Sequence, residues 1–116
     1  MYESKTLYVS DLDGTLLNDS SILSPTTERM LNELIADGAL FTIATARTPA
    51  TAVDLMRNVD TNIPFIVMAG CALWDNCRRD YISTRTIHPD HMAGILAIFE
   101  RRGSHPFVYH LRHGQL

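Results

Sequence analysis

Two carboxylates stand one residue apart near the amino terminus, where Asp11 and Asp13 follow the apolar run 7–9 and precede Gly14. Such a run is typical of a buried strand, so both acids are expected at the carboxyl end of that strand. Residues i and i+2 project from the same side of an extended chain, and their carboxylates can therefore reach one point in space. Two acids held there repel each other unless a cation is bound or one acid keeps its proton.

Two kinds of chemistry would use this pair. A hard divalent cation takes oxygen ligands, and a carboxylate can attack phosphorus while its neighbour moves a proton. Asp-Gly between apolar runs also favours a hairpin turn, and on spacing alone this alternative stays open. A calcium loop is disfavoured, because Gly14 comes three residues after Asp11 and not five.

The segment 11–17, Asp-Leu-Asp-Gly-Thr-Leu-Leu, resembles the first motif of the haloacid dehalogenase superfamily of phosphohydrolases. The resemblance implies that Asp11 is the nucleophile and Asp13 the general acid and base. It further implies that Asp11 and Asp13 hold Mg²⁺, and that Leu12 and Gly14 contribute to phosphate binding. The implied substrate is a small phosphorylated metabolite.

A second chemical stretch is Ala-Thr-Ala-Arg, residues 44–47, at the end of another expected strand. Ligands of open parallel sheets bind outside the carboxyl ends of the strands, so Thr45 could face the Asp11 site. The stretch resembles the second motif of the Cof-type branch, which usually reads Ala-Thr-Gly-Arg, with Ala46 in place of glycine. The resemblance implies that Thr45 binds phosphate. Arg47 could contact substrate or pair with a surface acid, and both interpretations stay open.

A third stretch, residues 66–75, resembles the segment where the Cof-type branch commonly has Asn-Gly-Ala before an aliphatic residue and Asp. Ala69 replaces that Asn, which leaves the substrate preference open. Trp74 alternates with Ala72 in an expected strand, which favours packing over ligand stacking.

The hydrophobic pattern predicts an α/β fold with a parallel sheet. The resemblance implies that this sheet belongs to a Rossmann-like core of three layers, incomplete, followed by the start of an inserted α+β cap. Strands are expected over 7–9, 39–45 and 63–68, and helices from Ser24-Pro25 to Gly38 and from Thr48-Pro49 to about Asn58. The first helix is expected to bury a face made of Met30, Leu31, Leu34 and Ile35. Turn-forming residues 18–21 predict a short hairpin beside the acids.

The pattern starts again at His88-Pro89, with a predicted helix that ends at Gly103 and a predicted strand over 107–111. This helix is expected to turn Met92, Ile95, Leu96 and Phe99 inward. Together with the resemblance, this implies a haloacid dehalogenase-like core over 1–84 and a truncated cap over 85–116. The nearby histidines are interpreted as surface residues, not zinc ligands: His105, His110 and His113.

Composition limits the function classes further. The net charge of −3 and the single lysine, Lys5, provide no basic face for nucleic acid. No apolar stretch approaches the roughly 20 residues that span a bilayer, and the first residues lack the order of a signal peptide. A cytoplasmic protein is expected, and Cys71 and Cys77 are therefore expected to be free thiols, as is usual in a reducing compartment.

The resemblance does not extend to the later motifs of the family, which supply a lysine and an acidic Gly-Asp-X-X-Asn-Asp type segment. No lysine follows Lys5, and the only acids beyond Asp80 are Asp90 and Glu100. The 116 residues therefore resemble the amino-terminal part of a Cof-type phosphatase. Two hypotheses follow: a Mg²⁺-dependent phosphatase that works through an aspartyl-phosphate, or a non-catalytic module that binds a partner or self-associates through exposed sheet edges.

Overall fold

The structure is a computed structural model that describes residues 6–112 of the chain. The chain divides into two compact units, Met1–Thr84 and Arg85–Leu116. No helix within the described range has the length and apolar character of a membrane span. The assignment of the first unit to a catalytic core and of the second to a cap stays a prediction.

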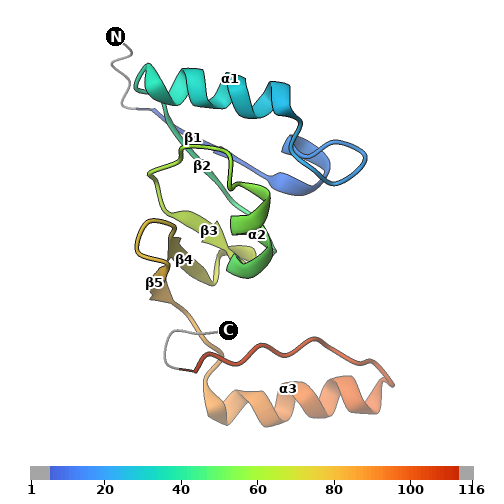
Figure 1. The fold of residues 1–116 in the computed structure, drawn as a ribbon. Helices are drawn as coiled ribbons and strands as arrows, with labels where there is room; N and C mark the ends of the chain where they lie inside the picture. Colours follow the sequence, from blue (N-terminus) through green and yellow to red (C-terminus); the bar gives the residue numbers. More distant parts are fainter. Residues whose placement is uncertain (1–5, 113–116) are drawn as a thin grey trace. The chain divides into compact units, whose positions relative to one another are not determined.

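The first unit begins with a parallel pair of strands (Figure 1). Strand β1 (Leu7–Ser10) lies beside β2 (Leu40–Ile43) in register, with Leu7 opposite Leu40 and Ser10 opposite Ile43. A single parallel bridge between Ala44 and Ile66 continues the order to β3 (Phe65–Val67). The three predicted strands are thus present, and β1 and β2 end at the same edge.

The sheet departs from the predicted parallel pattern at β3, which is shorter than the expected strand over 63–68. It pairs antiparallel with β4 (Ala72–Asp75), which in turn pairs antiparallel with β5 (Asp80–Thr84). The short connections explain this order, because a parallel crossover needs about a dozen residues or more. Cys71 and Cys77 flank β4 as exposed free thiols.

Helix α1 (Pro25–Ala36) has the predicted caps. The Ser24 hydroxyl accepts a hydrogen bond from the Thr27 amide at 3.2 Å, and Gly38 adopts a φ of 97° after the last turn. Such a left-handed residue satisfies the last carbonyls of a helix with little steric strain when it is glycine. The expected buried face is wrong in part: Leu31 and Ile35 pack on the core, whereas Met30 and Leu34 are 55% and 50% exposed.

Helix α2 (Pro49–Leu55) begins at the predicted proline and ends before the predicted Asn58. The backbone beyond it is used in a tertiary contact with α1. The Asn32 side chain donates to the Asn58 carbonyl at 2.8 Å and accepts from the Asp60 amide at 2.8 Å. These bonds to α1 take the place of further helical turns.

The predicted hairpin beside the acids is wrong, because residues 18–22 form a loop without strands. The side-chain oxygen of Asn18 accepts from the backbone amides of Ser20 and Ile22, and the backbone amide of Asn18 donates to the Ile22 carbonyl. An asparagine that binds its own local backbone in this way replaces a ladder of strand hydrogen bonds.

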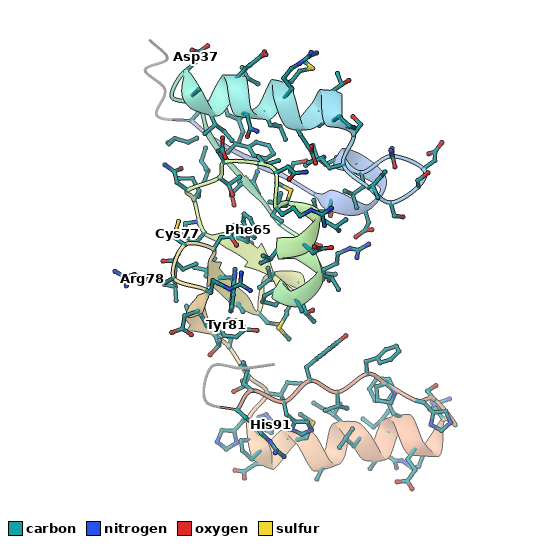
Figure 2. All side chains as sticks on the ribbon, in the orientation of Figure 1. Asp37, Phe65, Cys77, Arg78, Tyr81 and His91 are labelled. Carbon is teal, nitrogen blue, oxygen red and sulfur yellow. The ribbon has the colours of Figure 1, made fainter. Side chains whose placement is uncertain are left out.

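The hydrophobic core of the first unit contains buried residues from the acidic motif, β2, α2 and β3. Its largest fully buried side chains include Phe65, labelled in Figure 2, together with Leu12, Ile43, Met56 and Val67. Leu12 comes from the acidic motif itself and is fully buried between two exposed aspartates. Burial of a leucine side chain stabilises a fold by about 1.5 to 3 kcal/mol, so this residue anchors the motif to the core.

The second unit contains α3 (Pro89–Arg101), which buries no residue. The expected inward face is wrong for Leu96 and Phe99, which are exposed. The predicted strand over 107–111 is not formed, because no described residue pairs with it, and Phe107 is 92% exposed. His105 and His110 are exposed, as expected for surface residues, and His113 lies outside the described range.

Trp74 and Tyr81 face each other across β4 and β5, with ring centroids 5.0 Å apart and ring planes at 78°. Both pack against the core, which confirms the packing interpretation of Trp74. Within residues 6–112, the Trp74 indole nitrogen and the Tyr81 hydroxyl are buried without a hydrogen-bond partner. Their burial without partners makes both groups unfavourable to stability.

Removal of the Tyr81 hydroxyl should therefore leave the protein equally stable or more stable. We expect Tyr81→Phe to raise the free energy of unfolding by up to about 1 kcal/mol, because it keeps the ring contact and deletes an unsatisfied group. Urea unfolding measures this, with Tyr109→Phe in the second unit as the matched control at an exposed tyrosine. A loss of stability larger than in the control would contradict the unsatisfied state of the hydroxyl.

Candidate active site

Asp11 follows β1 directly and opens the acidic motif. Its backbone is extended, and its Oδ1 accepts a hydrogen bond from the Leu12 amide at 2.8 Å. The carboxylate is exposed, and Oδ2 has no hydrogen-bond partner in the part of the chain that the structure describes. One carboxylate oxygen is thus fixed and the other is available for chemistry.

The Asp-Gly pair forms a type II turn. Asp13 has φ −68° and ψ 127°, and Gly14 has φ 73° and ψ 3°. A two-residue hairpin of type I′ would need positive φ at both positions, so the hairpin alternative does not hold here. Gly14 occupies the position of a type II turn that favours glycine. The wider turn over Leu12–Leu16 is closed by the Leu17 amide, which donates to the Leu12 carbonyl at 3.0 Å.

Thr45 lies just beyond β2, the strand next to β1. Its amide donates to the Ile66 carbonyl at 2.9 Å, and its own carbonyl accepts from the Ala69 amide at 3.0 Å. The hydroxyl oxygen accepts from the Arg47 amide at 3.1 Å, which leaves its hydrogen to be donated. The predicted phosphate contact therefore has a donor at Thr45, although the residue is 5% exposed.

An ion pair joins the two loops. The Arg47 guanidinium donates to both carboxylate oxygens of Asp13, from Nε to Oδ2 at 2.8 Å and from Nη2 to Oδ1 at 2.7 Å. This hydrogen bonding and the guanidinium charge hold the pKa of Asp13 below its ordinary value, against the opposing effect of desolvation. Of the two open interpretations of Arg47, the structure shows an acid pair, and the acid belongs to the motif itself.

The sequence pattern places Met68 only at the end of an expected strand and does not indicate a role at the site, yet its backbone supports this loop. The Met68 amide donates to the Arg47 carbonyl at 2.9 Å. Met68, Ala69 and Gly70 have φ values of 52°, 55° and 89°, and the left-handed region costs a residue with a side chain roughly 1 to 2 kcal/mol. The local sequence signal for this left-handed backbone is Gly70. Asparagine would tolerate the left-handed conformation of position 69 better than the alanine present there.

The donor set for a metal is small. Among residues 6–112, no group of three or more His, Cys, Asp or Glu side chains could hold a metal ion. Asp11 offers one carboxylate oxygen without a partner, whereas both oxygens of Asp13 are taken by Arg47. Mg²⁺ is commonly held by one or two carboxylates with waters and substrate phosphate, so Asp11 fits such an ion, and the Asp13 ligand role stays a prediction.

Comparison with known proteins decides the family. The sequence matches the haloacid dehalogenase-like hydrolase family over residues 8–114. The chain belongs to this family. The match includes both strand-end loops and reaches into the second unit.

Individual relatives agree with this assignment. A Mycoplasma pneumoniae protein, whose name assigns it provisionally as a phosphatase, is 31% identical over 86 residues, which cover 69% of this chain and 30% of that protein. The 5-amino-6-(5-phospho-D-ribitylamino)uracil phosphatase of Bacillus subtilis is 29% identical over 86 residues, 74% of this chain and 34% of that protein. The solved structure of a sugar phosphatase of subclass IIB superposes with a TM-score of 0.66 at 22% identity, covering 85% of this chain and 38% of that chain.

The haloacid dehalogenase-like fold is shared in the part that matches. The chain spans about a third of the length of the curated relatives it matches. The roles of the individual site residues, namely Asp11, Leu12, Asp13, Gly14, Thr45 and Arg47, stay predictions.

Proposed function

We propose that the chain contributes the nucleophile, Asp11, and the acid and base, Asp13, to a Mg²⁺-dependent phosphatase of small phosphorylated metabolites. The observation that carries this proposal is the ion pair between Asp13 and Arg47, because it joins the loops after β1 and β2 at one edge of the sheet. The B. subtilis relative is named for a phosphorylated metabolite, which supports the substrate class.

In the proposed reaction, Oδ2 of Asp11 attacks phosphorus while the Leu12 amide holds Oδ1. The bond between phosphorus and the ester oxygen breaks, and that oxygen takes a proton from Asp13, which is protonated at this step and no longer paired with Arg47. The Thr45 hydroxyl donates to a phosphoryl oxygen. Water then gives a proton to the Asp13 carboxylate and attacks phosphorus, which releases inorganic phosphate and restores Asp11.

The balance of charges at the proposed site limits the Mg²⁺ binding and hydrolysis that we expect from the 116 residues alone. A phosphate monoester brings about −2 and ionised Asp11 another −1, while Mg²⁺, which would be held at Asp11, neutralises about two of these charges. No lysine follows Lys5 to balance the remainder, and the charge of Arg47 is already balanced by Asp13 in the structure. We therefore expect weak Mg²⁺ binding and little hydrolysis by these residues alone.

The alternative function is a non-catalytic module that self-associates. It is favoured by large apolar side chains that are exposed in both units: Leu7, Val9, Met30 and Leu34 in the first, and Ile98, Phe99 and Phe107 in the second. Apolar surface of this kind is commonly covered by another chain or segment.

The proposed activity is tested by Mg²⁺-dependent release of inorganic phosphate from a panel of sugar, nucleotide and aryl phosphates, assayed with protein that includes residues 1–116. Release that requires Mg²⁺ and is lost on chelation is expected from a form that also carries the neutralising groups. Absence of hydrolysis by every such form would overturn the proposal.

The same assay on the 116-residue chain gives a separate prediction. Little or no turnover and concentration-dependent self-association by light scattering are expected, because the charge at the site is unbalanced and apolar side chains are exposed. A monomeric chain with turnover of about 1 to 10³ s⁻¹, the ordinary range of enzymes, would contradict this expectation. The neutralising groups would then have to come from residues interpreted here as surface residues.

A further inference from the structure

The ion pair of Asp13 with Arg47 combines a fixed backbone with accessible side chains. The Arg47 backbone is held at both ends, by the Thr45 hydroxyl and by the Met68 amide. Its side chain is 31% exposed and that of Asp13 is 51% exposed. A guanidinium anchored in this way can change partners without movement of its loop.

A phosphate dianion is a direct competitor for this guanidinium. Carboxylate and phosphate both present two oxygens that match the fork of an arginine side chain, and phosphate carries the larger charge. The pair with Asp13 uses Nε and Nη2, so both ligands would require the same donors.

Asp13 is also occupied while the pair persists. Both of its carboxylate oxygens accept hydrogen bonds from Arg47, and neither is then available to a leaving group or a water molecule. The proposed chemistry at Asp13 therefore requires the pair to open.

We propose that the pair between Asp13 and Arg47 is a resting contact that the substrate's phosphate opens, taking Arg47 for itself and releasing Asp13 for proton transfer. This inference rests on the proposed function and adds a control step to it. Asp13 then becomes available only when a phosphate group occupies the site.

Inorganic phosphate binding to the 116-residue chain tests the exchange, measured by calorimetry for the wild type, Asp13→Asn, Arg47→Gln and the double variant. Asp13→Asn should bind phosphate about threefold to fivefold more tightly, the range to which an exposed ion pair corresponds. Arg47→Gln should bind about tenfold more weakly, because a charge-assisted bond is lost. In the Arg47→Gln background, Asp13→Asn should give a smaller gain in phosphate affinity, since only the repulsion between the Asp13 carboxylate and phosphate is then removed.

Two controls separate exchange from general electrostatics. Asp54→Asn removes a carboxylate from a comparable surface pair, in which Arg57 donates to Asp54 at 2.8 Å, and should leave phosphate affinity unchanged. Arg47→Lys keeps the charge but cannot form the two-pronged pair, so Asp13→Asn should gain less in that background.

Direct observation completes the test. The NMR signal of the Arg47 Nε–H group and the carboxyl carbon signal of Asp13 should both shift on phosphate addition, the latter toward its position in Arg47→Gln. Equal gains from Asp13→Asn in the wild-type and Arg47→Gln backgrounds, with an unchanged Asp13 signal, would overturn the exchange and leave the proposed phosphatase intact. Absence of phosphate binding in every variant would overturn the exchange, whereas the proposed phosphatase is overturned only by the Mg²⁺-dependent assay of forms that also carry the neutralising groups.

Discussion

Asp11→Asn should abolish phosphoryl transfer in any form of the protein that hydrolyses phosphate esters, with a fall in turnover on the order of 10³-fold or more. The amide keeps the shape of the side chain, and its oxygen can still accept from the Leu12 amide, as Oδ1 does at 2.8 Å. It lacks the negative oxygen that attacks phosphorus. The fold should therefore persist while the chemistry stops.

The measurement is turnover with a saturating phosphate ester, together with acid quenching and hydroxylamine trapping of the acyl-phosphate. Asp19→Asn is the matched control, because it makes the same charge change at an exposed aspartate in the following loop. Turnover and trapped intermediate should be lost in Asp11→Asn and kept in the control. Ordinary turnover by Asp11→Asn would remove Asp11 from the role of nucleophile.

Local chemistry made the starts of α1 and α2 and the end of α1 predictable. Ser24 with Pro25 opens α1, Gly38 follows its end in a left-handed conformation, and Pro49 opens α2. Each signal acts within a few residues, through a side-chain hydrogen bond, a fixed φ or the absence of a β-carbon. Such effects need no knowledge of the tertiary fold.

Burial and strand formation were harder to predict, because both depend on tertiary neighbours that the local sequence does not specify. Met30 and Leu34 have the spacing of an inward face, but in the described structure the core covers only the stripe with Leu31 and Ile35. The run 107–111 has the composition of a strand, yet a strand requires a neighbour for its backbone hydrogen bonds. No described residue supplies one.

At the site, the sequence indicated the acids but not their partners. The spacing of Asp11 and Asp13 left a hairpin open, and the backbone angles of Asp13 and Gly14 excluded it. The partner of Arg47 could not be read from the sequence, because 34 residues separate it from Asp13 along the chain. That contact depends on the parallel register of β1 and β2, a tertiary property.

Asp13→Asn should show a loss that depends on the leaving group. For alkyl and sugar phosphates, whose leaving oxygen needs a proton as the ester bond breaks, we expect turnover to fall by about 10² to 10⁴-fold. For activated aryl phosphates, whose leaving group departs as a stable anion, the loss should be much smaller. The ratio of the two losses measures how much proton donation by Asp13 contributes to turnover.

The ion pair complicates this prediction, because Asp13→Asn also frees Arg47. Arg47→Gln is the matched control: it breaks the same pair of hydrogen bonds but keeps the Asp13 carboxyl group. A variant that only loses the contact should bind alkyl and aryl phosphates more weakly to the same extent, because both classes bind through the same phosphate group. If Asp13→Asn also lowered turnover equally on both substrate classes, its effect would be that of a lost contact, and Asp13 would hold the loops together without moving the proton.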